Sequence, residues 1–523
     1  MKKFFRNLFS GYFLVLLLLL IELLIILFAQ IFLDDLVERI LGENSNPDEV
    51  KLIIVLIYLL FKLFVFFISL IIFFKIINKE EDPEFKIPWI VGMLLLPFFC
   101  SLVFLIFGNH GLRRKDKKIV INSNAEIKKY LKTDDNLYNE APGAFKYVTN
   151  TTSLSIYQNN LVKYYKAGEI FFPELMEHLK QAKKFIFMEL FIIHDGRLWD
   201  EVLSILKEKA QEGVEVRLIY DDMGSGGTIK SRTPKILRKQ GIKCYKFHPF
   251  RPILSGVYNN RDHRKIVVID GEIGFTGGMN LGDEYANIVK RFGYWKDTMI
   301  KIEGEAVKNL TAIFLQNFDL CTFKLSDYEK YLNIDVKSFE EPGLVMPFGD
   351  GPGGIDNALI GEQSYVNIIN SAKKEIYIST PYLIPTYELM DAMRNASLRG
   401  VKVNLIVPGI PDKKMVYKVA QSNFHFLLEA GVNIYTYTPG FNHMKTILVD
   451  DETAMVGTIN FDFRSLVHHF ECAAILYNTP CIKDIKEDFM EMVSVSKLVP
   501  KDFKLSKRVR RFCSLIKLFT PLM

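Results

Sequence analysis

Two copies of one polar pattern carry the groups in this sequence that could do chemistry. Each copy begins at a histidine and continues with lysine, aspartate, glycine and asparagine at offsets of +2, +7, +14 and +17. The copies are His263, Lys265, Asp270, Gly277 and Asn280, and then His443, Lys445, Asp450, Gly457 and Asn460. At roughly one chance in twenty per position, four matches after one histidine are a ~10⁻⁵ event, and here it occurs twice. Coincidence is therefore excluded.

The spacing of each histidine and lysine suits a phosphate group. Residues two apart on a β-strand point to the same face, so His263 and Lys265 present an imidazole beside an ammonium. His443 and Lys445 do the same in the second copy. We therefore predict a site for a phosphate ester.

The aspartates and asparagines of the pattern each allow two interpretations. Asp270 and Asp450 follow strand-like apolar runs, and Asp270–Gly271 is typical of a hairpin turn, so each aspartate is expected to hold a strand end more than to touch substrate. Asn280 and Asn460 follow glycine-containing turns. They either cap those turns or donate an amide to phosphate oxygens, and we favour phosphate binding.

The elements around the pattern are also duplicated. Short β-rich runs alternate with helical stretches of 10–15 residues, which is typical of an α/β fold. The pair AKKFIFMELFII (182–193) and GVEVRLIYDD (213–222) resembles the pair AKKEIYISTPYL (372–383) and GVKVNLIVPG (400–409). A duplicated pair of α/β lobes is the simplest explanation.

The N-terminal part is predicted to lie in a membrane. Hydrophobic residues make up 49% of the chain and the mean hydropathy is +0.13, above the usual value for a soluble enzyme. The runs 12–33, 52–74 and 88–107 are each long enough to cross a bilayer as a helix. The first is too long for a signal peptide and lacks a cleavage site, so we expect a retained anchor. Pro97 should kink the third helix.

Charge and cysteine usage exclude several classes of protein. The net charge is +6, and the tail 501–523 holds seven Lys and Arg against one Asp, so the rest of the chain is near neutral. A near-neutral body disfavours nonspecific nucleic-acid binding, which needs a dense cationic face. The tail reads as a basic amphipathic helix, lying on anionic lipid or packed on the body. The six cysteines show no metal-binding or disulfide spacing.

The motifs lead to a family resemblance. HRKIVVID (263–270) and HMKTILVD (443–450), with GGMN and GTIN behind them, resemble the phospholipase D superfamily. More narrowly, the chain resembles the bacterial cardiolipin synthases. The segments that carry this narrower resemblance include PWIVGMLLLP (88–97), NNRDHRK (259–265) and STPYLIP (379–385). The resemblance runs from about residue 88 to residue 523.

The resemblance implies an architecture for the whole chain. It places N-terminal transmembrane helices before two duplicated phospholipase D-like α/β lobes, with the active site at their interface. We expect a membrane anchor at 1–118, a first lobe at 119–340, a second lobe at 341–500 and the basic tail at 501–523. The protein would be a multi-pass cell-membrane protein. Two basic clusters compete for the cytoplasmic side, and we favour a cytoplasmic catalytic body.

The resemblance also implies a reaction. A phosphatidyl group would pass from one phosphatidylglycerol to another through a phosphohistidine, giving cardiolipin and glycerol. His263 would attack phosphorus and His443 would act as acid and then base, while Lys265, Lys445, Asn280 and Asn460 hold the phosphoryl oxygens. Asp297 and Glu471 would each orient the histidine of the opposite lobe. No metal and no nucleotide cofactor are expected.

One departure and several alternatives stay open. The family usually shows Asn-x-Glu after the second motif, whereas this chain reads His469-Phe470-Glu471. The motifs alone also fit a membrane phospholipase D that uses water as acceptor, or another phosphatidyltransferase such as a phosphatidylserine synthase. A nuclease is disfavoured by the neutral body and the apolar spans. An inactive scaffold is improbable because both motifs are intact.

Overall fold

The computed structural model describes residues 47–81, 83–108, 111–249, 259–352 and 358–520. Within these ranges the chain forms two units, one of which holds the apolar N-terminal helices and the other the α/β body. Each unit is described by itself. The predicted span 12–33 lies outside the described residues.

The N-terminal unit contains one long apolar helix. Helix α3 (Pro47–Ile77) includes Val55–Ile77, which in the described part of the chain is the one helix long and apolar enough to cross a membrane. It contains most of the predicted span 52–74. Large apolar side chains such as Leu60, Phe64 and Ile71 are more than 60% exposed, as suits a helix surrounded by lipid.

The third predicted span is two helices instead of one kinked helix. Helix α4 (Pro83–Leu95) ends one residue before α5 (Pro97–Phe107), and the residue between them, Leu96, has extended backbone angles (φ −139°, ψ 74°). Proline lacks an N–H group and disfavours a helical conformation in the residue before it, so Pro97 interrupts the helix. The Ser69 hydroxyl donates to the carbonyl of Pro97, and this bond links α3 to the break.

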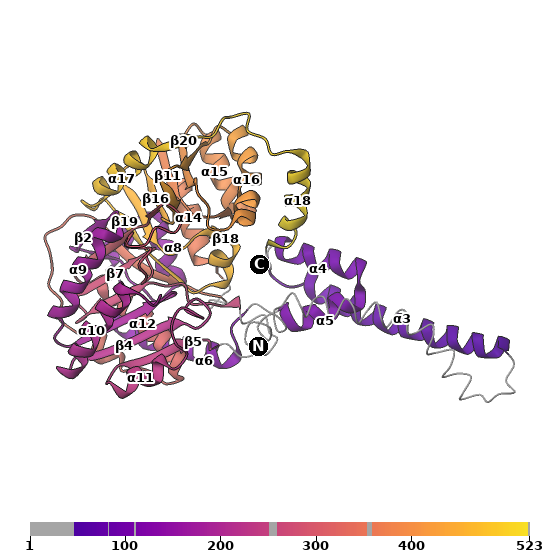
Figure 1. Ribbon diagram of the computed structural model, residues 1–523, viewed down its shortest axis with the longest axis horizontal. Coiled ribbons are helices and arrows are strands. Elements are labelled where there is room, and N and C mark those ends of the chain that lie inside the picture. The colour runs from indigo at the N-terminus through magenta and orange to yellow at the C-terminus, as the bar shows by residue number, and fades with distance from the viewer. Residues whose placement is uncertain (1–46, 82, 109–110, 250–258, 353–357, 521–523) are drawn as a thin grey trace. The chain divides into compact units, whose positions relative to one another are not determined.

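The α/β body contains two sheets with matching topology (Figure 1). The first sheet has the order β2-β9-β7-β6-β3-β4-β5, and the second has the order β1-β10-β19-β17-β16-β11-β13-β14-β20. The strands of the first sheet are β2 (Leu161–Tyr165), β9 (Met299–Glu303), β7 (Ile273–Gly277), β6 (Ile266–Ile269), β3 (Phe185–Leu190), β4 (Glu215–Asp221) and β5 (Lys243–Phe247).

The strands of the second sheet are β1 (Tyr157–Gln158), β10 (Leu344–Asp350), β19 (Glu471–Tyr477), β17 (Thr453–Gly457), β16 (Thr446–Val449), β11 (Glu375–Ser379), β13 (Lys402–Pro408), β14 (Asn433–Tyr437) and β20 (Ser496–Leu498). In the first sheet β6 is antiparallel to β3, and the pairs β3-β4 and β4-β5 are parallel. In the second sheet β16 is likewise antiparallel to β11, and the pairs β11-β13 and β13-β14 are parallel. The predicted duplication of α/β lobes is thereby confirmed.

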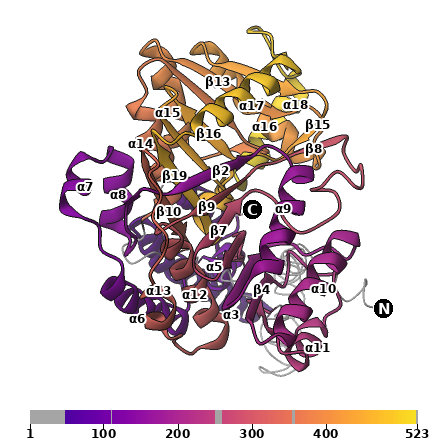
Figure 2. The same ribbon diagram turned by 90° about the vertical axis from the view of Figure 1, so that its left-hand side faces the viewer.

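Strands β3, β6 and β16 are buried along their whole length because both faces of the sheet are covered. On β3, Ile186 and Met188 belong to a cluster with helices α9 (Gly168–Gln181) and α10 (Arg197–Gln211). Phe185 and Phe187 point to the other face, against α12 (Val307–Thr322) and the second sheet. Figure 2 shows α9 and α10 on the outer side of the first sheet.

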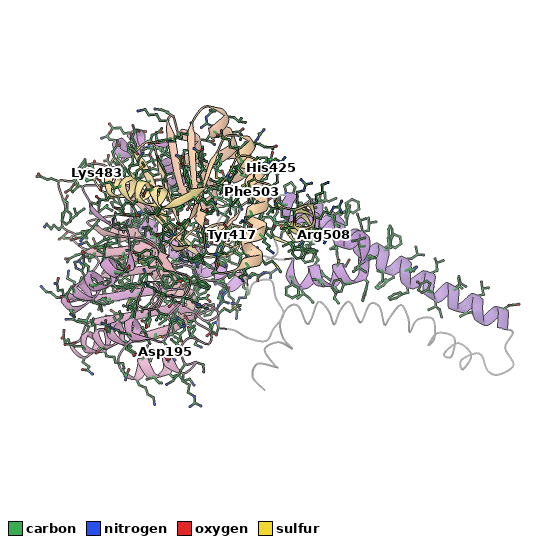
Figure 3. The ribbon with its side chains drawn as sticks, turned by 45° about the horizontal axis from the view of Figure 1, so that its top comes forward. Asp195, Tyr417, His425, Lys483, Phe503 and Arg508 are labelled. Carbon is green, nitrogen blue, oxygen red and sulfur yellow. The ribbon has the colours of Figure 1, made fainter. Side chains whose placement is uncertain are left out.

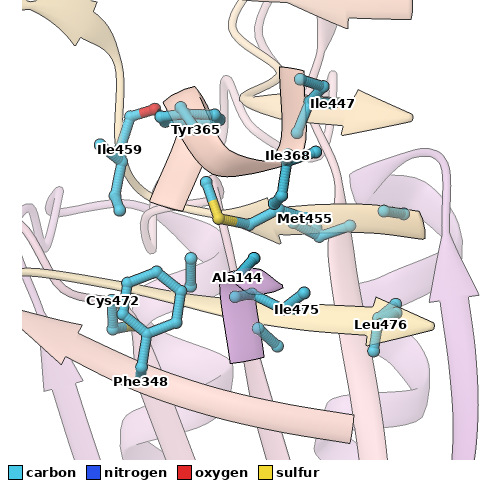
Figure 4. Close-up of a cluster of buried hydrophobic side chains, with 14 of the residues drawn as sticks. Ala144, Phe348, Tyr365, Ile368, Ile447, Met455, Ile459, Cys472, Ile475 and Leu476 are labelled. Carbon is cyan, nitrogen blue, oxygen red and sulfur yellow. The ribbon is translucent and has the colours of Figure 1, made fainter. Parts of the chain in front are cut away.

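The two lobes share one continuous core. Strands β7 and β9 of the first sheet lie against β17 and β19 of the second, and Figure 4 shows Met455 and Ile475 of the second sheet with Ala144 of α8 (Gly143–Thr151). The short strand β1, which precedes the first lobe's sheet in the chain, pairs with β10 of the second sheet. The active-site strands are therefore held by rigid packing between lobes.

The C-terminal helix α18 (Lys507–Lys517) packs on α16 (Lys414–Glu429) through Cys513, which is fully buried and donates to the carbonyl of Lys418. Other apolar residues of this end of the chain, Phe512 and Leu515, are 49% and 68% exposed. Figure 3 labels Arg508 on α18 and His425 on α16. The helix therefore packs on the body with one side and exposes basic and apolar residues on another.

Candidate active site

The two motif histidines lie where the lobes meet. His263 and Lys265 directly precede β6, and His443 and Lys445 directly precede β16. The backbone N–H of His263 donates to the carbonyl of Phe470 (2.8 Å), and that of His443 donates to the carbonyl of Lys296 (2.7 Å). Each motif is therefore tied by its backbone to the segment just before the other lobe's predicted carboxylate.

Each histidine side chain meets a carboxylate of the opposite lobe. His263 Nδ1 lies 2.9 Å from both carboxylate oxygens of Glu471, and His443 Nδ1 lies 2.6 Å from Asp297 Oδ2. Both carboxylates are buried, so Nδ1 carries the proton and donates it to the carboxylate. This arrangement leaves Nε2 of each ring as the basic nitrogen.

The two lysines are buried beside their histidines. The ammonium of Lys265 donates to the main-chain carbonyl of His263, and that of Lys445 donates to the carbonyl of His443 and lies 2.8 Å from His443 Nδ1. Both lysines are 1% exposed. The structure therefore brings an imidazole and an ammonium together in each motif.

Burial and mutual repulsion change the protonation of the site. Burial, and then the charges of Lys265 and Lys445, hold the pKa of His263 well below its usual value. Burial and the Lys445 charge lower the pKa of His443 to about 4. Burial lowers the pKa of Lys265 to about 8 and that of Lys445 to about 7. Both histidines are therefore neutral at pH 7. An anion that binds in the site would stabilise the charged forms of the two buried lysines.

Asp270 and Asp450 hold strand ends. Asp270 adopts a left-handed conformation (φ 57°) and accepts the backbone N–H groups of Lys183, Lys184 and Phe185 at 2.6–2.9 Å. Asp450 (φ 53°) accepts the equivalent groups from residues 373–375. These bonds join β6 to β3 and β16 to β11, and in both copies the partner is the duplicated Ala-Lys-Lys segment.

The two asparagines differ in their contacts. Asn280 accepts the backbone N–H of Ile192 (3.0 Å) and donates to the Tyr285 hydroxyl (2.7 Å), whose ring lies 5.8 Å from the His443 ring. Asn460 is 5% exposed, and its Oδ1 makes no hydrogen bond to a described residue. Asn280 thus supports the site through Tyr285 and Ile192 and keeps one amide N–H, whereas Asn460 keeps its carbonyl oxygen as a free acceptor among the described residues.

Sequence reasoning missed the residues that support the two carboxylates. The Thr458 hydroxyl donates to Glu471 and also accepts the Cys472 backbone N–H (2.9 Å). The equivalent position in the first copy is Gly278, where a Cβ atom would lie 2.0 Å from Asp297 Oδ1. The sequence held a signal for both residues, because each directly follows the glycine of the repeated pattern.

Aromatic rings complete the walls around the histidines. Phe191 lies edge to face against His263, with ring centroids 4.9 Å apart. The ring centroids of Trp295 and Phe441 lie 5.4 Å and 5.6 Å from that of His443. These rings exclude water and so account for much of the lowered pKa of both histidines. No pattern in the sequence pointed to them.

One group of metal-ligating side chains converges in the described part of the chain. It consists of His263, His469 and Glu471, all buried. His469 is the residue at which the sequence departs from the expected Asn-x-Glu, and its ring centroid lies 5.5 Å from that of His263. The departure seen in the sequence therefore lies inside the site.

The chain is similar to known proteins over most of its length. The profile described as "Cardiolipin synthase, PLD-like domain" matches residues 175–318 and 365–493. An uncharacterized protein of Streptococcus mutans serotype c is 40% identical over 461 residues, which are 86% of this chain and 98% of that protein. Cardiolipin synthase 2 of Bacillus anthracis is 34% identical over 468 residues, which are 88% of this chain and 90% of that enzyme.

A solved structure shares the fold. The crystal structure of phosphatidylserine synthase from Haemophilus influenzae superposes with a TM-score of 0.57 at 15% identity, over 73% of this chain and 100% of that one. At this identity the likeness concerns the fold alone. The profile match in both lobes and the identity over most of the chain go further, and they show that the chain belongs to the cardiolipin synthase family of phospholipase D-like proteins.

Proposed function

We propose that this protein is a cardiolipin synthase that transfers a phosphatidyl group from one phosphatidylglycerol to another. The products are cardiolipin and glycerol. The family membership supports the reaction class, and the apolar helix Val55–Ile77 supports a lipid substrate that stays in the membrane. One phosphodiester replaces another, so the reaction needs no input of chemical energy.

The observation that carries this proposal is the crossed pairing of His263 with Glu471 and His443 with Asp297. Each carboxylate holds the Nδ1 proton of the opposite histidine, which directs both Nε2 atoms to the reaction. One such nitrogen can attack phosphorus, and the other can be protonated to act first as acid and then as base. With two buried lysines beside them, these groups are what a double displacement at phosphorus requires.

In the first step His263 Nε2 attacks phosphorus and the bond to the glycerol oxygen breaks. His443 gives a proton to that oxygen, so glycerol leaves and a phosphatidyl-histidine remains. In the second step the hydroxyl of a second phosphatidylglycerol gives its proton to His443 and attacks phosphorus, which releases His263. The negative phosphodiester offsets the charges that depress the pKa of His443, and it thereby favours the protonated form in the complex.

Lys265, Lys445 and Asn460 would hold the phosphoryl oxygens as charge develops on them. Asn280 would act indirectly, through its hydrogen bond to the Tyr285 hydroxyl. Asp270 and Asp450 would contribute by holding β6 and β16 in place, without touching the lipid.

The deciding experiment identifies the products. Purified protein is incubated in vesicles with phosphatidylglycerol labelled in its glycerol headgroup. Cardiolipin and free glycerol should form in equal amounts, without added nucleotide. His425→Asn is a matched control, because His425 is an exposed histidine on α16 (47% side-chain exposure) and should leave the rate unchanged.

Two other outcomes would contradict the proposal. Phosphatidic acid as the main product would identify a hydrolase in which water is the acceptor. A product that forms only when serine and a liponucleotide are supplied would identify a phosphatidylserine synthase.

A further inference from the structure

The ring of His469 is buried and makes no hydrogen bond to any residue that the structure describes. Its side chain is 8% exposed, and neither ring nitrogen makes a hydrogen bond to a described residue. Nδ1 lies 3.6 Å from Glu471 Oε1, which is beyond hydrogen-bond length. A buried polar group normally has a partner, so this ring has the capacity for a ligand that the structure does not contain.

The neighbours of His469 have the geometry of a metal site. Donor atoms of His263, His469 and Glu471 lie within 4.8 Å of one another. Tetrahedral zinc, with bonds of about 2.0–2.2 Å, separates its ligand atoms by roughly 3.4 Å. Glu471 Oε1 lies 2.9 Å from His263 Nδ1 and 3.6 Å from His469 Nδ1, and these distances fall on either side of that value. Only small side-chain movements are needed to close the site.

The donor set selects the class of cation. Two imidazoles and one carboxylate suit zinc and similar transition-metal ions, whereas calcium and magnesium prefer sites made of oxygen. His263 and His469 are 5% and 7% exposed, so neither residue is completely closed to solvent.

We propose that His263, His469 and Glu471 form an inhibitory binding site for Zn²⁺ in the active site. Asparagine at position 469 lacks the imidazole that supplies the third ligand, so the site depends on the residue by which this chain departs from its family. The proposed metal binding depends only on these three side chains. Inhibition rests on the proposed role of His263 as nucleophile.

The chemistry of imidazole explains why zinc would inhibit. A neutral histidine that binds a metal through Nδ1 carries its proton on Nε2. Zinc would therefore displace the proton that Nδ1 gives to Glu471 and move the ring's proton to the nitrogen that attacks phosphorus. The nucleophile is blocked while zinc is bound, and removal of zinc restores it.

The test measures metal binding and activity separately. Wild type, His469→Asn and the exposed-histidine control His425→Asn are freed of metal, incubated with ZnSO₄ and passed through a desalting column. Zinc retained per chain and the dissociation constant are measured, with MgSO₄ as the second cation. Cardiolipin synthesis is then titrated with zinc, relative to the metal-free rate of each variant.

Wild type and His425→Asn should each retain one zinc per chain, and His469→Asn should bind zinc about 10–100-fold more weakly, as expected when a metal site loses a supporting group. Zinc should inhibit wild type, and EDTA should reverse this inhibition. His469→Asn should need 10–100-fold more zinc for the same inhibition. Magnesium should neither bind nor inhibit. Thermal unfolding of each variant, and His469→Gln as a second substitution, separate loss of the ligand from loss of the fold.

The proposal is overturned if folded His469→Asn and His469→Gln bind zinc as tightly as wild type, or if wild type retains no zinc. Retention by wild type without inhibition would uphold the metal site and overturn the inhibition. That result would count against His263 as nucleophile, whereas absence of cardiolipin synthesis in metal-free wild type would count against the proposed function itself.

Discussion

At the scale of single residues, the two histidines have matched surroundings but different proposed roles. His263→Ala should abolish the phosphoenzyme, because no nitrogen remains to attack phosphorus. His443→Ala should still form it but slow turnover by about 10²–10⁴-fold, since the leaving glycerol oxygen lacks its acid. Acid-quench experiments with phosphorus-labelled phosphatidylglycerol measure both quantities. A stable phosphoenzyme in His263→Ala, absent from His443→Ala, would reverse the assignment.

The two lysines make the reaction sensitive to alkaline pH. A lysine is charged below its pKa, and the values of about 8 for Lys265 and about 7 for Lys445 apply to the free enzyme. As pH rises through 7–8 the site loses positive charge and binds the phosphodiester less well, so kcat/KM should fall from about pH 7 upwards. Burial and the lysine charges hold the pKa of His263 well below its usual value, so protonation of the nucleophile should not limit the rate near neutral pH. A kcat/KM that rises steadily to pH 9 would contradict this assignment.

At the scale of the elements, Asp270 and Asp450 are expected to matter for stability more than for chemistry. Each carboxylate accepts three backbone N–H groups that join two strands. Asp450→Ala should lower the free energy of unfolding by about 2 kcal/mol, the scale of hydrogen bonds to a charged group, and Asp450→Asn should lower it by less. Chemical denaturation measures both, and kcat of the folded protein should change only slightly. A 100-fold loss of kcat at unchanged stability would instead place this carboxylate in the chemistry.

Helix α18 is predicted to bind anionic lipid with the side that does not pack on α16. Phe512 and Leu515 are exposed next to a run of basic residues, whereas Cys513 is buried. Each Lys or Arg near an anionic surface adds about 1 kcal/mol of attraction. A peptide of residues 501–523 should therefore bind vesicles of phosphatidylglycerol and not those of phosphatidylcholine, as measured by sedimentation. Equal binding to both would remove the electrostatic contribution and leave packing on α16 as the role of the helix.

At the scale of the whole molecule, we predict a three-span anchor with the catalytic body in the cytoplasm. The turn between α3 and α4 would then lie outside the cytoplasm, and α11 (Thr233–Lys239) would lie inside. Glu80→Cys should react with an impermeant maleimide in intact cells, whereas Lys239→Cys should react only after lysis. Both positions are exposed in the structure, so reactivity reports the side of the membrane. The opposite labelling pattern would place the body outside.

Two features show where local sequence rules stopped being sufficient. Pro97 was expected to kink a single helix, but the chain leaves the helix at Leu96, because proline disfavours a helical conformation in the residue before it and a neighbouring helix can hold the resulting break. Here the Ser69 hydroxyl binds the Pro97 carbonyl. Asn280 contacts Tyr285 and Ile192 through its amide, and these contacts arise only when two loops of the folded lobe meet; one N–H of the amide is left for the phosphate that the sequence predicted.

The sequence by itself determined the chemistry that is repeated and local. Equal offsets after His263 and His443 revealed the duplication, and alternating apolar runs predicted the α/β lobes, because these properties depend on neighbours within a few residues. The tertiary structure decided which groups meet. Glu471 is 208 residues from His263 and Asp297 is 146 from His443, and the family resemblance alone had suggested these partners. Contacts across such distances depend on how two sheets pack, and that packing also put His469 beside His263. The pairing of β17 with β19 within the second sheet put Thr458 on Glu471.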